Sequence, residues 1–143
     1  MKSKVLVFIQ FSLIFLMLIP LSDYSSFKFV GFFFILLGIT VGILGIKQHP
    51  KDNFNIRPDI KESCILITDG VYKYIRHPMY FSVIVSMLGV LFLKFSFLEM
   101  VLYILLVTNM VIKMLYEESL WHCDRDEYKE YAKSTKRLIP YVF

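Results

Sequence analysis

Residues 29–46 read Phe-Val-Gly-Phe-Phe-Phe-Ile-Leu-Leu-Gly-Ile-Thr-Val-Gly-Ile-Leu-Gly-Ile, an uncharged run of apolar and small residues. A helix needs about 20 such residues to cross a hydrocarbon core of about 30 Å, so this run predicts a membrane-spanning helix. Residues 5–21 are equally free of charge and predict another. The chain of 143 residues is 57% hydrophobic and 17% aromatic, which is too apolar for an ordinary soluble domain. We therefore predict a single membrane-embedded domain over residues 1–143.

A further apolar stretch, residues 79–112, is too long for one crossing and is interrupted by Lys94 and Glu99. We expect a tight hairpin of two helices there, with Lys94 near the turn extending its ammonium to the lipid headgroups. The predicted fold is an all-α integral membrane protein of about four transmembrane helices, at residues 5–21, 27–46, 78–97 and 98–116.

After the last predicted span, Trp121, Tyr128, Tyr131 and Ala132 recur at helical spacing among charged residues. This pattern predicts an amphipathic C-terminal helix on the cytoplasmic side. Most lysines and arginines fall in residues 47–76 and 113–137, which places these segments and both termini in the cytoplasm.

The net charge of +4 follows from this topology, so we expect a membrane partner and no nucleic acid. The two cysteines, Cys64 and Cys123, would both lie on the reducing side of the membrane, which disfavours a disulfide. Neither has the partner spacing of a metal site, and we expect no metal.

A polar, cationic and aromatic cluster stands directly before the third predicted span. Residues 68–80 read Thr-Asp-Gly-Val-Tyr-Lys-Tyr-Ile-Arg-His-Pro-Met-Tyr, in which Asp69-Gly70 predicts a turn and Pro78 a helix start. Arg76 and His77 would then offer donors to a carboxylate or phosphate at the helix start.

Other side chains of this cluster and of the last span can complement such a ligand. The rings of Tyr72, Tyr74 and Tyr80 can face a cation such as a sulfonium, and Glu117 and Glu118 can bind an amine or ribose hydroxyls. One ligand with an amine, a carboxylate, a sulfonium and a ribose would use all of these groups.

The same residues also have a purely structural interpretation. Arg76 and Lys73 can anchor the chain to headgroups, and the tyrosines can form an interfacial aromatic belt. Glu117 and Glu118 can form a solvated helix face paired with Lys113.

Several motifs follow one another along the chain: Gly70-x-Tyr72-x-x-x-Arg76-His77-Pro78-x-Tyr80, an apolar hairpin, Glu117-Glu118-x-Leu120, Glu127-Tyr128-x-x-Tyr131 and Arg137-x-x-Pro140. Taken together they closely resemble the isoprenylcysteine carboxyl methyltransferase and phospholipid methyltransferase superfamily. The resemblance covers residues 64–140. It implies an all-helical membrane enzyme without a Rossmann domain, which takes S-adenosylmethionine from the cytosol and a lipophilic acceptor from the bilayer.

The resemblance also implies roles for individual residues. Arg76 is a candidate catalytic residue for positioning or charge balance, and Lys113 stands in a region where relatives often carry an arginine near the acceptor. Glu117 or Glu118 would bind the polar end of the cofactor. The remaining cofactor-binding candidates are Cys64, Ile65, Leu66, Ile67, Tyr72, His77, Pro78, Met79 and Tyr80.

The acceptor stays open at this stage, because a lysine cannot copy the bidentate binding of a carboxylate by arginine. An isoprenylcysteine-like carboxylate, a lipid amine such as phosphatidylethanolamine, a quinone-like or isoprenoid molecule and a small thiol are all possible, and the oligomeric state is undetermined. Two other classes of function remain as alternatives. One is an NADPH-dependent membrane reductase of the sterol reductase type, and the other is a non-catalytic membrane interaction protein.

Overall fold

The computed structural model describes residues 2–20, 27–48, 66–124 and 126–139 of the chain. The described elements are helices, as predicted, together with one isolated parallel bridge between Ile75 and Lys136. In chain order they are α1 (Lys2–Leu18), α2 (Lys28–Lys47), the short 3-10 helix η1 (Gly70–Lys73), α3 (Pro78–Leu93), α4 (Phe97–Asp124) and α5 (Asp126–Ser134).

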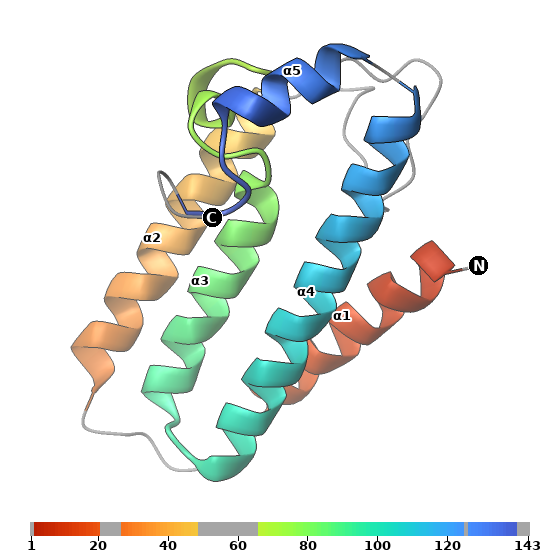
Figure 1. Ribbon diagram of the computed structural model, residues 1–143. Coiled ribbons are helices and arrows are strands. Elements are labelled where there is room, and N and C mark those ends of the chain that lie inside the picture. Colours follow the sequence, from red (N-terminus) through yellow and green to blue (C-terminus); the bar gives the residue numbers. More distant parts are fainter. Residues whose placement is uncertain (1, 21–26, 49–65, 125, 140–143) are drawn as a thin grey trace.

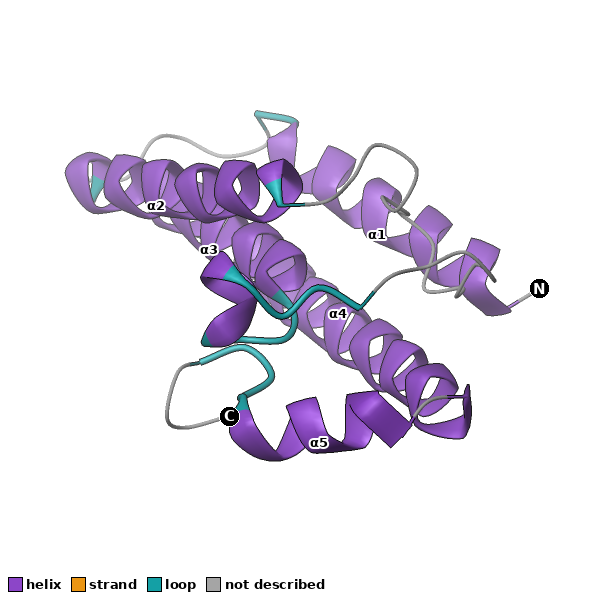
Figure 2. Cartoon of the chain, turned by 90° about the horizontal axis from the view of Figure 1, so that it is seen from above, coloured by secondary structure: helices purple, strands orange, loops and turns teal. Residues whose placement is uncertain are grey.

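The four longer helices form a bundle in which α2 packs on α3, α3 on α4, and α1 on both α4 and α3. Figures 1 and 2 show α5 lying across one end of this bundle, beside the turn that leads into α3. At the same end Gly70 adopts a positive φ of 59°, which favours glycine and confirms the predicted turn. The side chain of Gln48, just after α2, accepts the Val71 amide hydrogen at 3.2 Å and so fixes this turn to the bundle.

In α2 the large apolar side chains face outward, while the glycines are buried. In α2, Phe29 is 90% exposed and Leu36 65% exposed, whereas Gly31 and Gly38 are buried against α3. This arrangement suits helices surrounded by lipid, whose association depends on close packing of small residues. A β-carbon on Gly38 would lie 2.7 Å from backbone atoms of Ser82 and Ser86, so the two helices are as close as glycine permits.

Two helices, α2 and residues 97–121 of α4, are long and apolar enough to cross a membrane. The other two, α1 and α3, are apolar but shorter, with 17 and 16 residues. At about 1.5 Å per residue they are somewhat shorter than a core of about 30 Å. The predicted four-span topology therefore stays a prediction, whereas the two longer helices have the expected span character.

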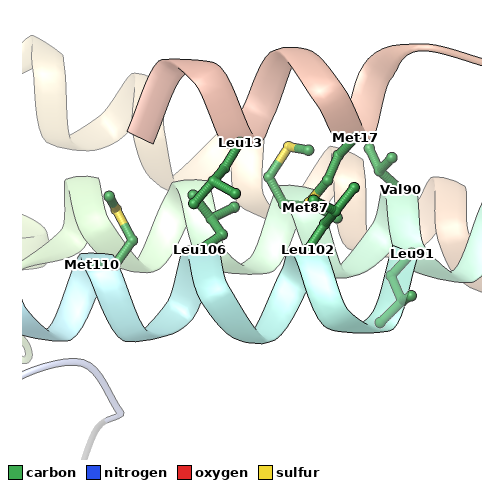
Figure 3. Packing of buried hydrophobic residues seen from close by; sticks show 8 residues of the cluster. All are labelled: Leu13, Met17, Met87, Val90, Leu91, Leu102, Leu106 and Met110. Carbon is green, nitrogen blue, oxygen red and sulfur yellow. The ribbon is translucent and has the colours of Figure 1, made fainter. Parts of the chain in front are cut away.

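A compact apolar cluster holds α1, α3 and α4 together (Figure 3). Its side chains interdigitate between the three helices, and Met17 of α1 and Leu106 of α4 are fully buried. The buried members are Leu13, Met17, Met87, Val90, Leu91, Leu102, Leu106 and Met110. This cluster fixes α1 against α4, so side chains on the facing surfaces of the two helices have defined partners.

Several helix boundaries differ from the prediction. The third helix ends at Leu93 and not at residue 97, and the first covers residues 2–18 and not 5–21. The proline at position 20 disfavours helical geometry at the residue before it, which accounts for the early end of α1. The fourth helix continues past residue 116 to Asp124, because residues 97–124 contain no glycine or proline to stop it. Glu117 and Glu118 therefore lie on α4 itself.

The expectation that Lys94 extends to the headgroups is wrong. Its side chain is buried, with the ammonium bonded to the Met17 carbonyl, 2.9 Å from the Ile19 carbonyl and 3.2 Å from a carboxylate oxygen of Glu99. The last carbonyls of a helix lack intrahelical partners and attract cations. Lys94 therefore caps the C-terminal end of α1, which this side chain can reach from the hairpin turn.

Candidate active site

The segment before α3 is bonded to the segment after α5. The Arg76 amide donates to the Lys136 carbonyl at 2.7 Å, and the His77 amide donates to the Arg137 carbonyl at 3.1 Å. With the bridge between Ile75 and Lys136, these bonds join two stretches that are about 60 residues apart in the sequence. The polar cluster at the start of α3 is therefore built together with the C-terminal segment.

Glu118 lies at the centre of this junction and is 4% exposed. One of its carboxylate oxygens, Oε1, is 3.1 Å from Arg76 Nε and 3.2 Å from His77 Nε2. The other, Oε2, is 2.9 Å from Arg137 Nε. We call Glu118, Arg76, His77 and Arg137 the clasp, because they join α4, the start of α3 and the C-terminal segment.

Arg76 is directed into the protein. Besides Glu118, its guanidinium donates through Nη1 to the carbonyls of Ala132, at 2.9 Å, and of Thr135. These contacts hold the end of α5, and they contradict the interpretation of Arg76 as a headgroup anchor. They suit a residue that positions its neighbours, while a direct role in catalysis stays a prediction.

Glu117 has a different environment from Glu118, although the two residues are adjacent in the sequence. The Tyr80 hydroxyl donates to Glu117 Oε2 at 2.6 Å, and this is a neutral partner. The Tyr80 ring in turn lies 5.3 Å from Lys113 Nζ, which donates to Gln10 Oε1 at 2.8 Å. We call these four residues, Glu117, Tyr80, Lys113 and Gln10, the polar row.

The predicted pairing of the two glutamates with Lys113 on a solvated face does not occur as expected. Lys113 is 3% exposed and its hydrogen bond goes to Gln10 on α1, while Glu118 bonds the clasp. Two members of the polar row, Glu117 and Lys113, lie on α4 one helical turn apart, and Lys113 is the one nearer the middle of that helix.

The tyrosines of the site are mostly buried. Tyr72 is 7% exposed, and its carbonyl accepts the Tyr131 hydroxyl at 2.5 Å. Burial raises the pKa of Tyr131 to about 12, and burial followed by the charge of Glu117 raises the pKa of Tyr72. Both phenols are therefore neutral at physiological pH. Tyr74, at 57% exposed, is the one whose position suits an interfacial belt.

Helix α5 packs on the end of α4 through aromatic side chains. Trp121 and Tyr128 stack with ring centroids 5.6 Å apart, and Tyr131 and Leu66 pack against the same cluster. Burial and the nearby charge of Glu118 raise the pKa of Tyr128. Residues 129 and 130 of α5 are exposed. The predicted placement of α5 as an amphipathic helix on the cytoplasmic side stays a prediction.

The structure brings many of the predicted site residues to one end of the bundle. His77 N-caps α3 and its ring packs edge-on against Tyr80, with centroids 5.4 Å apart. Pro78 and Met79 pack beside Gly45 of α2, and Leu66 and Ile67 are half-buried. Cys64 and Ile65 lie outside the described residues.

Two residues of the site were not predicted from the sequence: Gln48, which supports the turn at Gly70, and Gln10, which binds Lys113. Arg137 was part of a quoted motif but had no assigned role, and it completes the clasp. Gln10 could have been singled out from the sequence, because an amide side chain in a largely apolar span needs a hydrogen-bond partner when it is buried.

Comparison with known proteins assigns the chain to a family. Residues 29–121 match the isoprenylcysteine carboxyl methyltransferase (ICMT) family, and this stretch is well over half of the chain. The chain belongs to the ICMT family. The matched stretch contains α2, η1, α3 and α4 up to Trp121, so it includes most of the clasp and most of the polar row.

The ICMT family assignment agrees with a distant relative in Schizosaccharomyces pombe. The chain is 29% identical over 80 residues to a protein named Protein-S-isoprenylcysteine O-methyltransferase. The alignment covers 54% of this chain and 34% of the relative, so the chain spans about a third of the relative's length. No solved structure matches the chain.

Proposed function

We propose that this protein is an integral membrane methyltransferase that transfers a methyl group from S-adenosylmethionine to a lipophilic acceptor bearing a carboxylate, of the isoprenylcysteine type. One observation carries the proposal. In the polar row, Glu117 bonds the neutral Tyr80 hydroxyl, forms no ion pair with the described residues, and lies one tyrosine ring away from a buried lysine. The row thus offers an acidic group and a basic group to two different ligands at the membrane boundary.

Glu117 is the glutamate that suits the cofactor. Its neighbour Glu118 is occupied by Arg76, His77 and Arg137, whereas Glu117 bonds the neutral Tyr80 hydroxyl. A carboxylate in this position can accept hydrogen bonds from an amino group or from ribose hydroxyls, both of which S-adenosylmethionine has. The rings of Tyr72, which is buried, and Tyr80, which is half-buried, offer faces that suit its sulfonium.

Lys113 suits an anionic acceptor better than an amine. Both groups that hold its ammonium, the Gln10 amide oxygen and the Tyr80 ring, are neutral. A fixed ammonium repels a protonated lipid amine and attracts a carboxylate, and burial strengthens both effects. The position of Lys113 therefore favours the isoprenylcysteine-like carboxylate over the lipid amine that the sequence left open.

The chemistry requires little from the protein besides placement. A new bond forms between the methyl carbon and a carboxylate oxygen while the bond from that carbon to sulfur breaks, so the sulfonium becomes a neutral thioether and no proton is transferred. An ionised carboxylate needs no general base. The protein would align the two reactants and exclude water, with Lys113 holding the carboxylate and Glu117 the donor.

We also propose that the protein has four membrane spans and that both termini lie in the cytoplasm. Lys94 bonds the end of α1, and the Asn109 amide donates to the Leu6 carbonyl at 3.2 Å, which supports opposite directions for α1 and α4. With α2 and α3 also antiparallel (Figure 1), the start of α1 and the end of α4 lie toward the same end of the bundle.

A binding titration followed by a transfer assay tests the proposal. The detergent-purified protein is titrated with S-adenosylmethionine by calorimetry, with NADPH as a second ligand, and is then given methyl-labelled S-adenosylmethionine and N-acetyl-S-farnesylcysteine. We expect saturable binding of S-adenosylmethionine and label in the acceptor.

The matched variants are Glu117→Gln and Glu130→Gln, the second on the exposed face of α5. Losing a hydrogen bond to a charged group costs about 1.5–3 kcal/mol, so Glu117→Gln should weaken binding about 10- to 100-fold while Glu130→Gln leaves it unchanged. A folded wild-type protein that binds NADPH and not S-adenosylmethionine would contradict the proposal. So would equal affinities in the two variants.

A further inference from the structure

Helix α1 contributes a polar side chain to the site although it lies outside the matched residues 29–121. Ser3, Gln10 and Met17 are spaced seven residues apart, and all three are buried. At this spacing they lie on one face of α1, which the cluster of Figure 3 packs against α4. Gln10 therefore faces α4 from a largely apolar stretch of α1.

The partner of Gln10 is a buried charged side chain. An ammonium within a membrane-spanning helix is expensive unless polar groups surround it, and Lys113 is 3% exposed on α4. The Gln10 amide oxygen accepts one of its hydrogens at 2.8 Å, and the Tyr80 ring lies 5.3 Å away. A lysine ammonium has three donors and a flexible stem of four carbons, so its direction depends on these two contacts.

We propose that Gln10 is a positioning residue, which directs the Lys113 ammonium toward the anionic group of the acceptor. This inference rests on the proposed function, because it assumes that Lys113 binds the acceptor. Without the amide, the contact that Lys113 keeps within the described part of the chain is the one with the Tyr80 ring, whose hydroxyl is bonded to Glu117. The ammonium would then occupy several rotamers, and fewer of them would place it beside the methyl donor.

The bundle supplies a control within the same interface. Asn109 of α4, one turn before Lys113, donates to the Leu6 carbonyl of α1 at 3.2 Å. A leucine at position 109 removes one hydrogen bond between α1 and α4, as a leucine at position 10 does, and leaves Lys113 and Gln10 intact. Both variants weaken helix packing, but only Gln10→Leu releases the ammonium.

The first measurement is independent of turnover. Wild-type, Gln10→Leu and Asn109→Leu proteins in detergent are treated briefly with acetic anhydride, and acetylation of Lys113 is quantified by mass spectrometry. We expect Gln10→Leu to change the labelling rate of Lys113 at least threefold, on the order expected for losing a hydrogen bond, and Asn109→Leu to leave it unchanged. Equal rates in wild type and Gln10→Leu would overturn the inference.

The second measurement is methyl transfer to N-acetyl-S-farnesylcysteine. We expect Gln10→Leu to raise KM for this acceptor about tenfold without changing the Kd of S-adenosylmethionine, and Asn109→Leu to change neither. Because Gln10 acts through Lys113, Gln10→Leu should have no further effect in a Lys113→Met background. Additive effects of the two substitutions would show a merely structural role and refute positioning.

The two measurements separate the inference from the proposed function. A wild-type protein that transfers no methyl group refutes the proposed function, and with it the role of Lys113 toward the acceptor. The labelling rates then still decide whether Gln10 directs Lys113. Active wild-type protein with unchanged KM in Gln10→Leu refutes the inference alone.

Discussion

Replacing Glu118 with glutamine tests whether this carboxylate closes the C-terminal segment onto the bundle. The substitution keeps the shape of the side chain but removes the negative charge that Arg76, His77 and Arg137 share. Removing one partner of a buried ion pair costs about 3–5 kcal/mol, because the other charge is left without compensation.

Because of the other contacts of the clasp, we expect the loss of free energy in Glu118→Gln to be at the low end of that range. Arg76 keeps its bonds to the carbonyls of Ala132 and Thr135, and the Arg137 side chain is 37% exposed and can turn to solvent. We therefore expect a loss of about 3 kcal/mol for the closed arrangement. This corresponds to an opening equilibrium that is about 100-fold more favourable.

Hydrogen exchange of the detergent-solubilised protein measures this opening directly. The reporters are the amides of Arg76 and His77, which are bonded to the carbonyls of Lys136 and Arg137 in the closed arrangement. In Glu118→Gln both amides should exchange about 100-fold faster than in the wild type, because local opening limits their exchange.

The neighbouring glutamate gives the control. Glu117→Gln changes the charge equally, but the bond that it alters is the one from the neutral Tyr80 hydroxyl, which an amide oxygen can still accept, and the clasp stays intact. The same amides should therefore exchange at close to the wild-type rate in this variant. If the two variants exchange alike at Arg76 and His77, Glu118 does not close the C-terminal segment and the interpretation of the clasp is wrong.

Two further substitutions test the packing of the helices, with thermal unfolding in detergent as the measurement. Gly38→Ala should destabilise the protein by about 1–3 kcal/mol, because its methyl group would lie 2.7 Å from backbone atoms of α3. Gly45→Ala should cost less, since its methyl group would meet the flexible Met79 side chain at 3.2 Å, and equal losses would contradict this reasoning. Lys94→Met should destabilise by about 3–5 kcal/mol by leaving Glu99 buried and unpaired, and an added Glu99→Leu should restore part of the loss, whereas no recovery would refute the pairing.

The helical fold was predictable from the sequence because it depends on hydropathy alone. The runs around residues 5–21 and 29–46 carry no charge, and a chain in lipid must bond its backbone internally, so helices follow. The end of the fourth helix was missed because the prediction stopped where the apolar run ends. Helix α4 continues through Glu117 and Glu118 to Asp124, since a change of polarity does not stop a helix when no residue breaks it.

The partners of the buried charges were not predictable, because they come from segments far apart in the sequence. Lys94 is 75 residues from the carbonyl of Ile19 that it caps, and Lys113 is 103 residues from Gln10. Long side chains such as these can reach lipid headgroups or a neighbouring helix, and hydropathy does not distinguish the two. The choice depends on which helices are adjacent, and only the packing of α1 on α4 decides it.

The clasp changes how an inactive Arg76 variant should be interpreted. Arg76 bonds Glu118 and two carbonyls at the end of α5, so replacing it would open the C-terminal segment whether or not the guanidinium meets a ligand. Lost turnover in Arg76→Ala therefore identifies a catalytic group only if the amide of His77 remains as slow to exchange as in the wild type. Glu117 and Lys113 are less subject to this ambiguity, because their hydrogen bonds in the described part of the chain go to Tyr80 and Gln10 and not to the C-terminal segment, so their variants report on ligand binding more directly.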